Sequence, residues 1–149
     1  MRRTLLSIAA LALVVLAAGA APAQVRTVSL SAQAVEAMTG ATASVDPNIP
    51  QDLLGQLKAT FQFNQWKSLG TFNGSAAVGQ MWSTPLGASG YTFEATPKSV
   101  DGGAITLDAR LTRQGSEVVK STLRLQPGAR VIFSGKAGTG GIFVAVTGR

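Results

Sequence analysis

Polar and apolar residues alternate in the segment that follows residue 24. Apolar side chains occupy Val28, Leu30, Ala32 and Ala34, and Ser or Gln stands between them. A period of two is typical of a strand with one buried face. We therefore predict a first strand over residues 25–35.

The period becomes helical after a turn-rich connection over residues 39–50. Pro50 suits the first position of a helix, where its missing N–H costs nothing. The apolar residues that follow recur every three or four positions, at Leu53, Leu54, Leu57 and Phe61. We predict a short helix that ends near Thr60 and packs this stripe on a sheet. It is the one helix we expect.

Turn residues divide the rest of the chain into short segments. Turns of this frequency indicate meandering antiparallel strands, and Gln126–Ala129 fits a type II turn, with Pro at its second position and Gly at its third. The predicted turns are Asn73-Gly74, Gly87–Gly90, Asp101–Gly103, Gln114–Ser116, Pro127-Gly128 and the glycine-rich stretch 135–141.

The clearest predicted hairpin joins residues 104–113 to residues 117–125. If Ile105 lies opposite Leu125, the other apolar residues of the two strands also face one another. The opposite face then carries charged and hydroxyl side chains, with Arg110 opposite Lys120. This division fits a sheet with one buried side.

Two later runs, 131–133 and 142–146, are apolar on both faces. They predict central strands covered on both sides, with the helix as one cover. The alternative is that one face docks on a partner. We expect a single α+β domain over residues 24–149, in which one short helix packs on a mainly antiparallel β-meander sheet of sandwich or partial-barrel shape.

The N-terminal residues have the features of a cleavable signal peptide. Arg2 and Arg3 precede an apolar run from Leu5 to Ala18, and Ala21–Ala23 has the small-x-small pattern of a cleavage site. We predict a signal peptide over residues 1–23 and a periplasmic or secreted protein. The apolar run is shorter than the roughly 20 residues of a membrane span, and no later segment approaches that length. We expect no transmembrane segment in the mature chain.

Composition restricts the chemistry of the mature chain. Arg2 and Arg3 are two of its 13 basic residues, so 11 remain against 7 acidic ones, a net charge of +4. Cysteine and histidine are absent, which removes disulfides, thiolate metal sites and the commonest general base. We expect no catalytic, metal-binding or cofactor-binding residue. Residues 134–141 are rich in glycine but lack the spacing and Ser/Thr of a phosphate-binding loop.

Two groups of residues are candidates for binding. Arg110, Lys120 and Arg124 share the outward face of the predicted hairpin, and we interpret them as a docking stripe for an anionic polymer or an acidic protein surface. The alternative is a solvated sheet face on which Asp108 relieves the repulsion between Arg110 and Lys120. The second group is an apolar pocket or core built from Leu53, Leu57, Phe61 and Trp66.

The last third of the chain has a further pattern. Ser121–Leu125, the turn Gln126–Ala129, the run to Phe133, Gly135 and the final run Gly141–Thr147 follow one another. This order resembles the strand, glycine-turn, strand, glycine-loop, strand pattern near the end of bacterial secretins, and of small exported bacterial proteins that carry it. The chain lacks the length of a secretin channel domain. The resemblance implies a periplasmic assembly or interaction module.

These observations lead to three alternatives for function. We expect a non-catalytic binding or assembly module of the bacterial cell envelope, whose partner is another envelope protein or an anionic envelope polymer. The second alternative is a periplasmic carrier of a small apolar ligand, and the third is an enzyme with a carboxylate pair. Aromatic residues are few and not interleaved with basic ones, so we expect no specific nucleic-acid binding. Uncapped edge strands leave oligomerisation open.

Overall fold

The computed structural model describes residues 26–149. The predicted signal peptide, residues 1–23, lies outside this range. The described part contains nine strands and one helix: β1 (Thr27–Met38), β2 (Ser44–Val45), α1 (Gln51–Thr60), β3 (Gln65–Ala77), β4 (Trp82–Pro85), β5 (Tyr91–Asp101), β6 (Ala104–Arg113), β7 (Ser116–Leu125), β8 (Val131–Ala137) and β9 (Gly140–Gly148).

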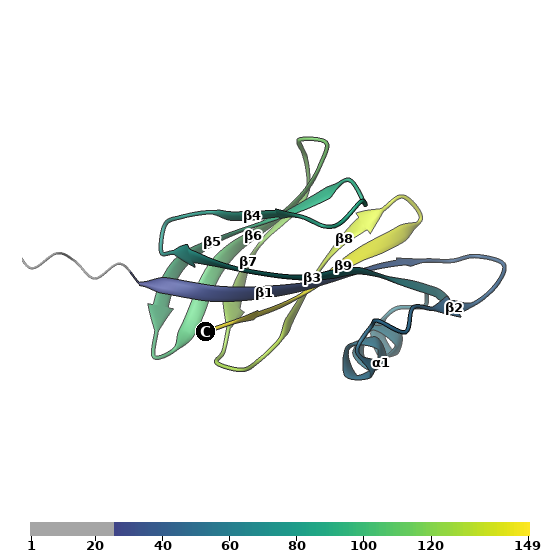
Figure 1. Cartoon of the computed structure of the whole chain (residues 1–149), viewed down its shortest axis with the longest axis horizontal. Coiled ribbons are helices and arrows are strands. Elements are labelled where there is room, and N and C mark those ends of the chain that lie inside the picture. Colours follow the sequence, from purple (N-terminus) through teal and green to yellow (C-terminus); the bar gives the residue numbers. More distant parts are fainter. Residues whose placement is uncertain (1–25) are drawn as a thin grey trace, which may run out of the picture.

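The strands form two sheets that face one another (Figure 1). The first sheet has the order β2-β3-β1-β9-β8, and the second has the order β4-β5-β6-β7. Every ladder is antiparallel except the two-residue pairing of β2 with β3. The predicted class, α+β with one short helix and a mainly antiparallel sandwich, is confirmed.

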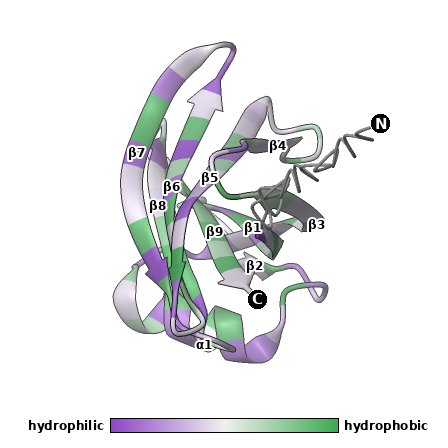
Figure 2. Cartoon of the chain, turned by 90° about the vertical axis from the view of Figure 1, so that its left-hand side faces the viewer, coloured by the Kyte–Doolittle hydropathy of each residue, from purple (hydrophilic) through white to green (hydrophobic). Residues whose placement is uncertain are grey.

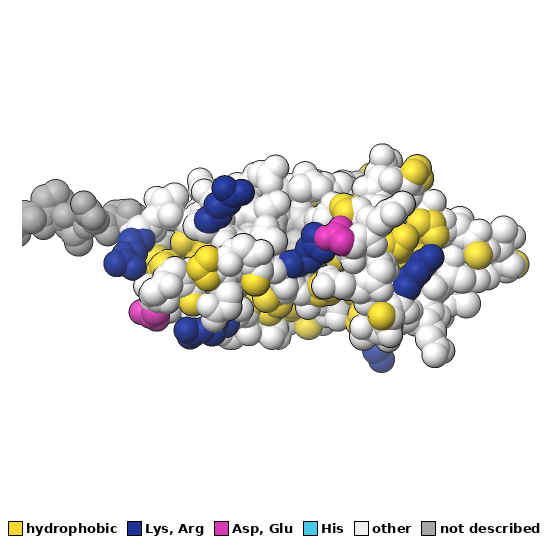
Figure 3. Space-filling model, turned by 90° about the horizontal axis from the view of Figure 1, so that it is seen from below, with side chains coloured by type: hydrophobic (Ala, Val, Ile, Leu, Met, Phe, Trp, Pro, Cys, Tyr) yellow, Lys and Arg dark blue, Asp and Glu magenta, His cyan; other side chains and the backbone are white. Residues whose placement is uncertain are grey.

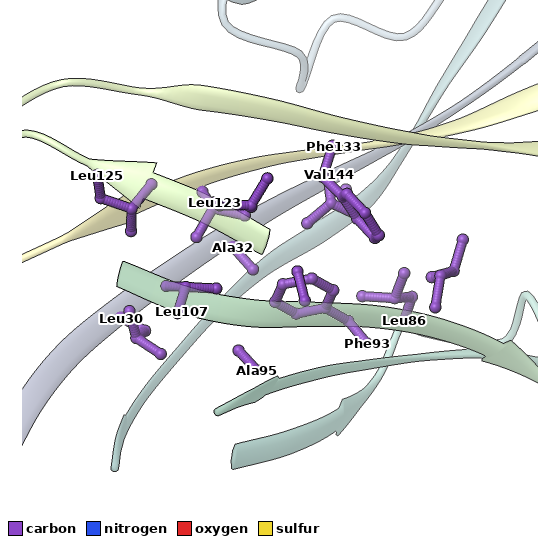
Figure 4. Packing of buried hydrophobic residues seen from close by; sticks show 14 of the residues in the cluster. Leu30, Ala32, Leu86, Phe93, Ala95, Leu107, Leu123, Leu125, Phe133 and Val144 are labelled. Atoms are coloured by element: carbon purple, nitrogen blue, oxygen red, sulfur yellow. The ribbon is translucent and has the colours of Figure 1, made fainter. Parts of the chain in front are cut away.

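The main hydrophobic core lies between the two sheets. β1 contributes alternate residues, as its period of two predicts, and the second sheet contributes large side chains such as Phe93 and Leu107, both 0 % exposed. Figure 4 shows Phe93 below Phe133 and Val144 of the first sheet, and the Phe93 and Phe133 rings are 6.1 Å apart between centroids. Burial of this kind is the main stabilising contribution to a fold without disulfides.

A second, smaller core lies on the other face of the first sheet, under α1. The helix buries Leu53 and Leu57 there, at 1 % and 0 % exposure. The sheet contributes Val35, Ala37, Trp66, Phe143 and Ala145. The helix therefore covers the part of β1 whose outward residues are apolar and leaves uncovered the part where they are Ser29, Ser31 and Gln33.

A bulge in β3 lets one strand serve both cores. Ala34 of β1 lies opposite Gly70, whereas Val35 lies opposite Ser68, so Leu69 is an extra residue. Gly70 has a φ of 119°, which favours glycine. The extra residue reverses the alternation, because a shift by one moves every side chain to the other face. Trp66 therefore joins the core under the helix, while Ala76 is buried on the side of the sandwich.

The predicted hairpin of β6 and β7 is confirmed in its register. Ile105 lies opposite Leu125, and Arg110 lies opposite Lys120. Figure 2 shows hydrophobic and hydrophilic residues following one another along β6 and β7. The following turn is also confirmed, because the Ala129 N–H donates to the Gln126 carbonyl at 3.0 Å and Gly128 has a φ of 74°.

The helix ends at Thr60, as predicted, but it begins at Gln51 and Pro50 precedes it as the N-cap. The helix is also tied to the turn between β7 and β8, because Asp52 accepts a hydrogen bond from Arg130 at 3.0 Å. No other helix occurs in residues 26–149.

Three predictions about turns and strand positions are wrong. Asn73-Gly74 is not a turn but lies within β3, where a Cβ at Gly74 would overlap the Trp82 indole, so glycine is needed for close packing. The run 131–133 belongs to β8, an edge strand rather than a central one. The stretch 135–141 is mostly strand, with only Gly138-Thr139 forming its turn. The other apolar run, in β9, is central and buried on both faces, as predicted.

Candidate functional site

The outer face of the second sheet carries the three residues of the predicted docking stripe. The register places Glu94 of β5, Arg110 of β6 and Lys120 of β7 in one row across the sheet. Arg124 lies further along β7, opposite Thr106. A shallow pocket of about 130 Å³ lies on this face, and its lining includes Met81, Glu94, Arg110 and Lys120.

Arg110 is neutralised within the sheet. Its guanidinium forms a hydrogen bond and a salt bridge with the Glu94 carboxylate, whose side chain is only 15 % exposed. A paired guanidinium beside a largely covered carboxylate has little charge left for an external anion. Arg110 therefore stabilises the sheet through its pairing with Glu94. Of the predicted stripe, Lys120 and Arg124 are left to bind an external anion.

Asp108 has a different partner from the one expected. It accepts a hydrogen bond from the Thr122 hydroxyl at 3.0 Å and lies 3.3 Å from the Lys98 ammonium. The Thr122 hydrogen bond, aided by Lys98 and by the charge of Lys120, holds the pKa of this carboxyl below its usual value. The Asp108 carboxylate therefore balances the charge of Lys98, whereas the Glu94 carboxylate balances the charge of Arg110.

Lys120 and Arg124 are the remaining basic side chains of the stripe. Both residues are exposed on β7, which is an edge strand of its sheet. Within residues 26–149 neither has a carboxylate within salt-bridge distance. On the face seen in Figure 3 the Lys and Arg side chains are spread singly rather than gathered in one patch, and one of them adjoins an acidic side chain. The candidate docking surface is the exposed side of β7 with these two cations.

The predicted apolar pocket is mostly a closed core. Leu53, Leu57 and Trp66 are 1 %, 0 % and 2 % exposed. The indole N–H of Trp66 donates to the Phe63 carbonyl at 3.1 Å, which fixes the ring against the sheet. These three side chains fill the space between helix and sheet, so a ligand is not held between them.

An open groove lies beside this core, where the helix ends. It has a volume of about 430 Å³, and Phe61 of the predicted pocket lines it together with Phe63 and Phe143. The rings of Phe61 and Phe143 are 4.5 Å apart between centroids. Ser134, Lys136 and the glycines of the β8–β9 hairpin complete the lining. Sequence reasoning places Phe63 on the apolar surface that continues from the helix. It did not bring Phe143 or Lys136 to this site, because nothing in their spacing shows that the hairpin folds against the helix end.

The described residues give the following account of metal sites and membrane spans. Among residues 26–149, no three side chains of His, Cys, Asp or Glu are grouped so that they could hold a metal ion. No helix in this part of the chain has the length and apolar character to cross a membrane.

No protein-family model, curated protein or solved structure matches the chain. The segment that resembles the end of secretins forms β7, β8 and β9 with the turns between them. This order of strands is also what a hairpin-rich sandwich produces, and the secretin-like relationship stays a prediction.

Proposed function

We propose that this chain is an exported, non-catalytic binding module of the bacterial cell envelope that docks on an anionic polymer or an acidic protein surface through β7. The single observation that supports the proposal is the pair Lys120 and Arg124, which have no salt-bridge partner in the described part of the chain. Glu94 and Asp108 on the same face are both engaged by basic partners. An incoming anion would therefore contact Lys120 and Arg124 without displacing a carboxylate of the chain itself.

Export is inferred from residues 1–23, whose pattern is that of a signal peptide. A periplasmic or secreted location follows if this segment directs the chain out of the cytoplasm. Envelopes contain abundant anionic polymers, so a mildly basic module has partners of suitable charge there.

The test is salt-dependent binding to dextran sulfate, a soluble polyanion. The variant K120Q/R124Q is compared with K58Q/K67Q, which removes the same charge from exposed positions on the helix and on β3. We expect the first variant to weaken binding about tenfold at low salt and to lower the slope of log K against log salt by about two, as two ionic contacts are lost. Equal effects of the two variants would show attraction by net charge alone and would reject β7 as the site.

The groove at Phe61, Phe63 and Phe143 supports a second candidate function, a carrier of a small apolar ligand. Three aromatic rings beside glycine backbone form a mostly apolar surface with one cation, Lys136, in its lining. Such a surface suits an apolar molecule with an acidic group.

Titration with anilinonaphthalene sulfonate, an aromatic anion, tests the carrier function. We expect Phe63→Ala to weaken binding about tenfold, because a ring of the lining is removed, and Met81→Ala, which lies elsewhere, to have no effect. Absence of binding to the unmodified chain, or an equal loss in both variants, would exclude the groove.

A further inference from the structure

The edge of the first sheet at β3 is unpaired over most of its length. Within residues 26–149, β2 pairs only with Gln65 and Trp66, and no other strand is hydrogen-bonded to this side of β3. Figure 1 shows β3 running along the sandwich beside β1, with β2 reaching only its far end. The open edge therefore begins after Trp66 and continues to Ala77.

The ends of this edge are satisfied within the chain. The Ser68 N–H donates to the Asp46 carboxylate at 3.1 Å, and the Gln80 N–H donates to the Ala77 carbonyl at 2.9 Å. A Cβ on Gly87 would lie 3.0 Å from the Leu69 carbonyl, so the turn after β4 lies against that group. In the part of the chain that the structure describes, the segment between these points has no such backbone partner.

The free backbone groups of the segment belong to Thr71, Asn73 and Ser75. The Val78 N–H donates to the Arg26 carbonyl beside β1. Alternate residues of an antiparallel strand direct their N–H and C=O groups to opposite sides. Val78 and the even-numbered residues before it, back to Gly70, therefore direct theirs toward β1, and the odd-numbered residues direct theirs away from it. Thr71, Asn73 and Ser75 are exposed, and none forms a hydrogen bond to another strand on that side in the described structure.

This edge also lacks the features that keep edge strands apart. No charged residue occurs between Lys67 and Glu94, and β3 contains no proline. Natural proteins protect edges with charges, proline or very short strands. The other edges follow that rule: β4 has four residues and ends in Pro85, β7 carries Lys120 and Arg124, and β8 carries Lys136.

Two exposed apolar side chains, Val45 and Val78, lie near the two ends of this edge. Among residues 26–149 the exposed large hydrophobic residues are Met38, Val45, Val78 and Met81, at 39 %, 43 %, 37 % and 56 %. Val45, on β2, adjoins the start of the open edge, and Val78 follows its end. Met38 pairs with Gln65 from the β1 side, and Met81 lines the shallow pocket on the outer face of the second sheet. Two antiparallel copies of β3 would bring the start of one edge beside the end of the other. The surface is therefore complementary to itself.

We propose that β3 pairs with β3 of a second copy of this chain, antiparallel and about a two-fold axis at Asn73. In this register Thr71 lies opposite Ser75 of the second copy, and the free groups of all three residues form about six hydrogen bonds. Val78 of one copy then approaches β2 of the other, with its exposed Val45. The contact is isologous and closes at two copies, and it lies on the opposite side of the sandwich from β7, so it goes beyond the proposed docking function.

Light scattering and sedimentation of the purified chain over a range of concentrations test this pairing. We expect a dimer for the unmodified chain and a dissociation constant raised at least about tenfold in Asn73→Lys, which places two like charges directly opposite one another. The matched control is Ser29→Lys, an exposed position on the adjoining strand β1, paired with Ser75 but away from the edge. We expect it to leave the dimer unchanged. A monomer at every concentration, or equal effects of the two lysines, would overturn the proposal.

Disulfide trapping tests the register independently, because the chain has no cysteine. Residues opposite one another in a hydrogen-bonded antiparallel pair have Cα atoms about 5.5 Å apart, within disulfide range. Asn73→Cys should form a covalent dimer on mild oxidation, and Ser121→Cys, on the edge strand β7, should not. Equal trapping at both positions would contradict the register. Asn73→Lys and Ser29→Lys add the same charge away from β7 and should bind dextran sulfate equally, so failure of this proposal and failure of the docking function give different results.

Discussion

Asp108 shows how single residues set the charge of the second sheet's outer face. Its carboxylate lies between the Thr122 hydroxyl and the Lys98 ammonium, and its pKa is held below 3.8 mainly by the Thr122 hydrogen bond. A carboxyl whose pKa is lower in the folded chain than in the unfolded chain stabilises the fold above its ordinary pKa. That stabilisation is lost as the pH falls through the lowered value.

The pH dependence of folding tests this assignment. The free energy of unfolding should decrease as the pH falls below about 4, where unfolded carboxyls begin to take up protons. Thr122→Val should make this decrease smaller, because it removes the main cause of the lowered pKa while the carboxyl remains. Urea unfolding at pH 7 and at pH 3 measures the difference. An unchanged pH dependence in Thr122→Val would show that the hydrogen bond does not act on Asp108.

Gly74 illustrates a residue whose role depends on a distant neighbour. Asn-Gly is a strong signal for a two-residue turn, and by that rule the chain should reverse at residue 73. Instead the glycine lies within β3, where the Trp82 indole occupies the place that a side chain would take. Such a requirement arises only once β4 lies beside β3.

At the scale of elements, α1 is held by burial rather than by its own helical propensity. It has ten residues, fewer than the 12 to 15 that an isolated helix needs to be even marginally stable in water. Leu53 and Leu57 lie against Val35, Trp66 and Phe143 of the first sheet. The helix is therefore stabilised by packing on the apolar outer face at one end of that sheet.

Leu57→Ala should cost about 3 kcal/mol of the free energy of unfolding, because a fully buried leucine leaves a cavity. Leu54→Ala, which truncates a half-buried leucine on the same helix, should cost about 1 kcal/mol. Urea unfolding followed by tryptophan fluorescence measures both. Equal costs would contradict the packing of α1 described above.

The bulge at Leu69 is the element that joins the two cores. Without it, β3 would place Trp66 on the same face as Ala76, and the core under the helix would lose its indole. The shift occurs next to Gly70, but a lone glycine in a strand indicates a bulge only in general terms. The register with β1 determines where it falls.

At the scale of the whole molecule, the two ends of the described chain lie side by side. β1 pairs with β9, and β9 is buried on both faces, by the second sheet on one side and by the helix core on the other. Nearly every ladder outside the hairpins joins distant parts of the sequence. Such topologies fold slowly and as one cooperative unit.

Removal of residues 140–149 should therefore abolish cooperative unfolding of the remaining chain, because both cores lose β9 at once. The control is insertion of Gly-Ser within the exposed turn at Gln114-Gly115, which should leave the unfolding transition in place. Circular dichroism during thermal unfolding measures both. A sigmoidal transition in the truncated chain would show that β9 is not essential to either core.

Sequence alone determined the local features of this protein: the alternation in β1, the helix stripe, the β6–β7 register and most turns. These follow from periods of two and 3.6 and from turn chemistry, which act between near neighbours. Only the tertiary structure decided which strands are edges, that β8 is one and that β3 is left open beyond its short pairing with β2. It also decided that Arg110 is neutralised by Glu94, that Leu53, Leu57 and Trp66 form a closed core, and that a groove opens beside Phe61. Each depends on contacts between segments far apart in the chain, which local periodicity does not encode.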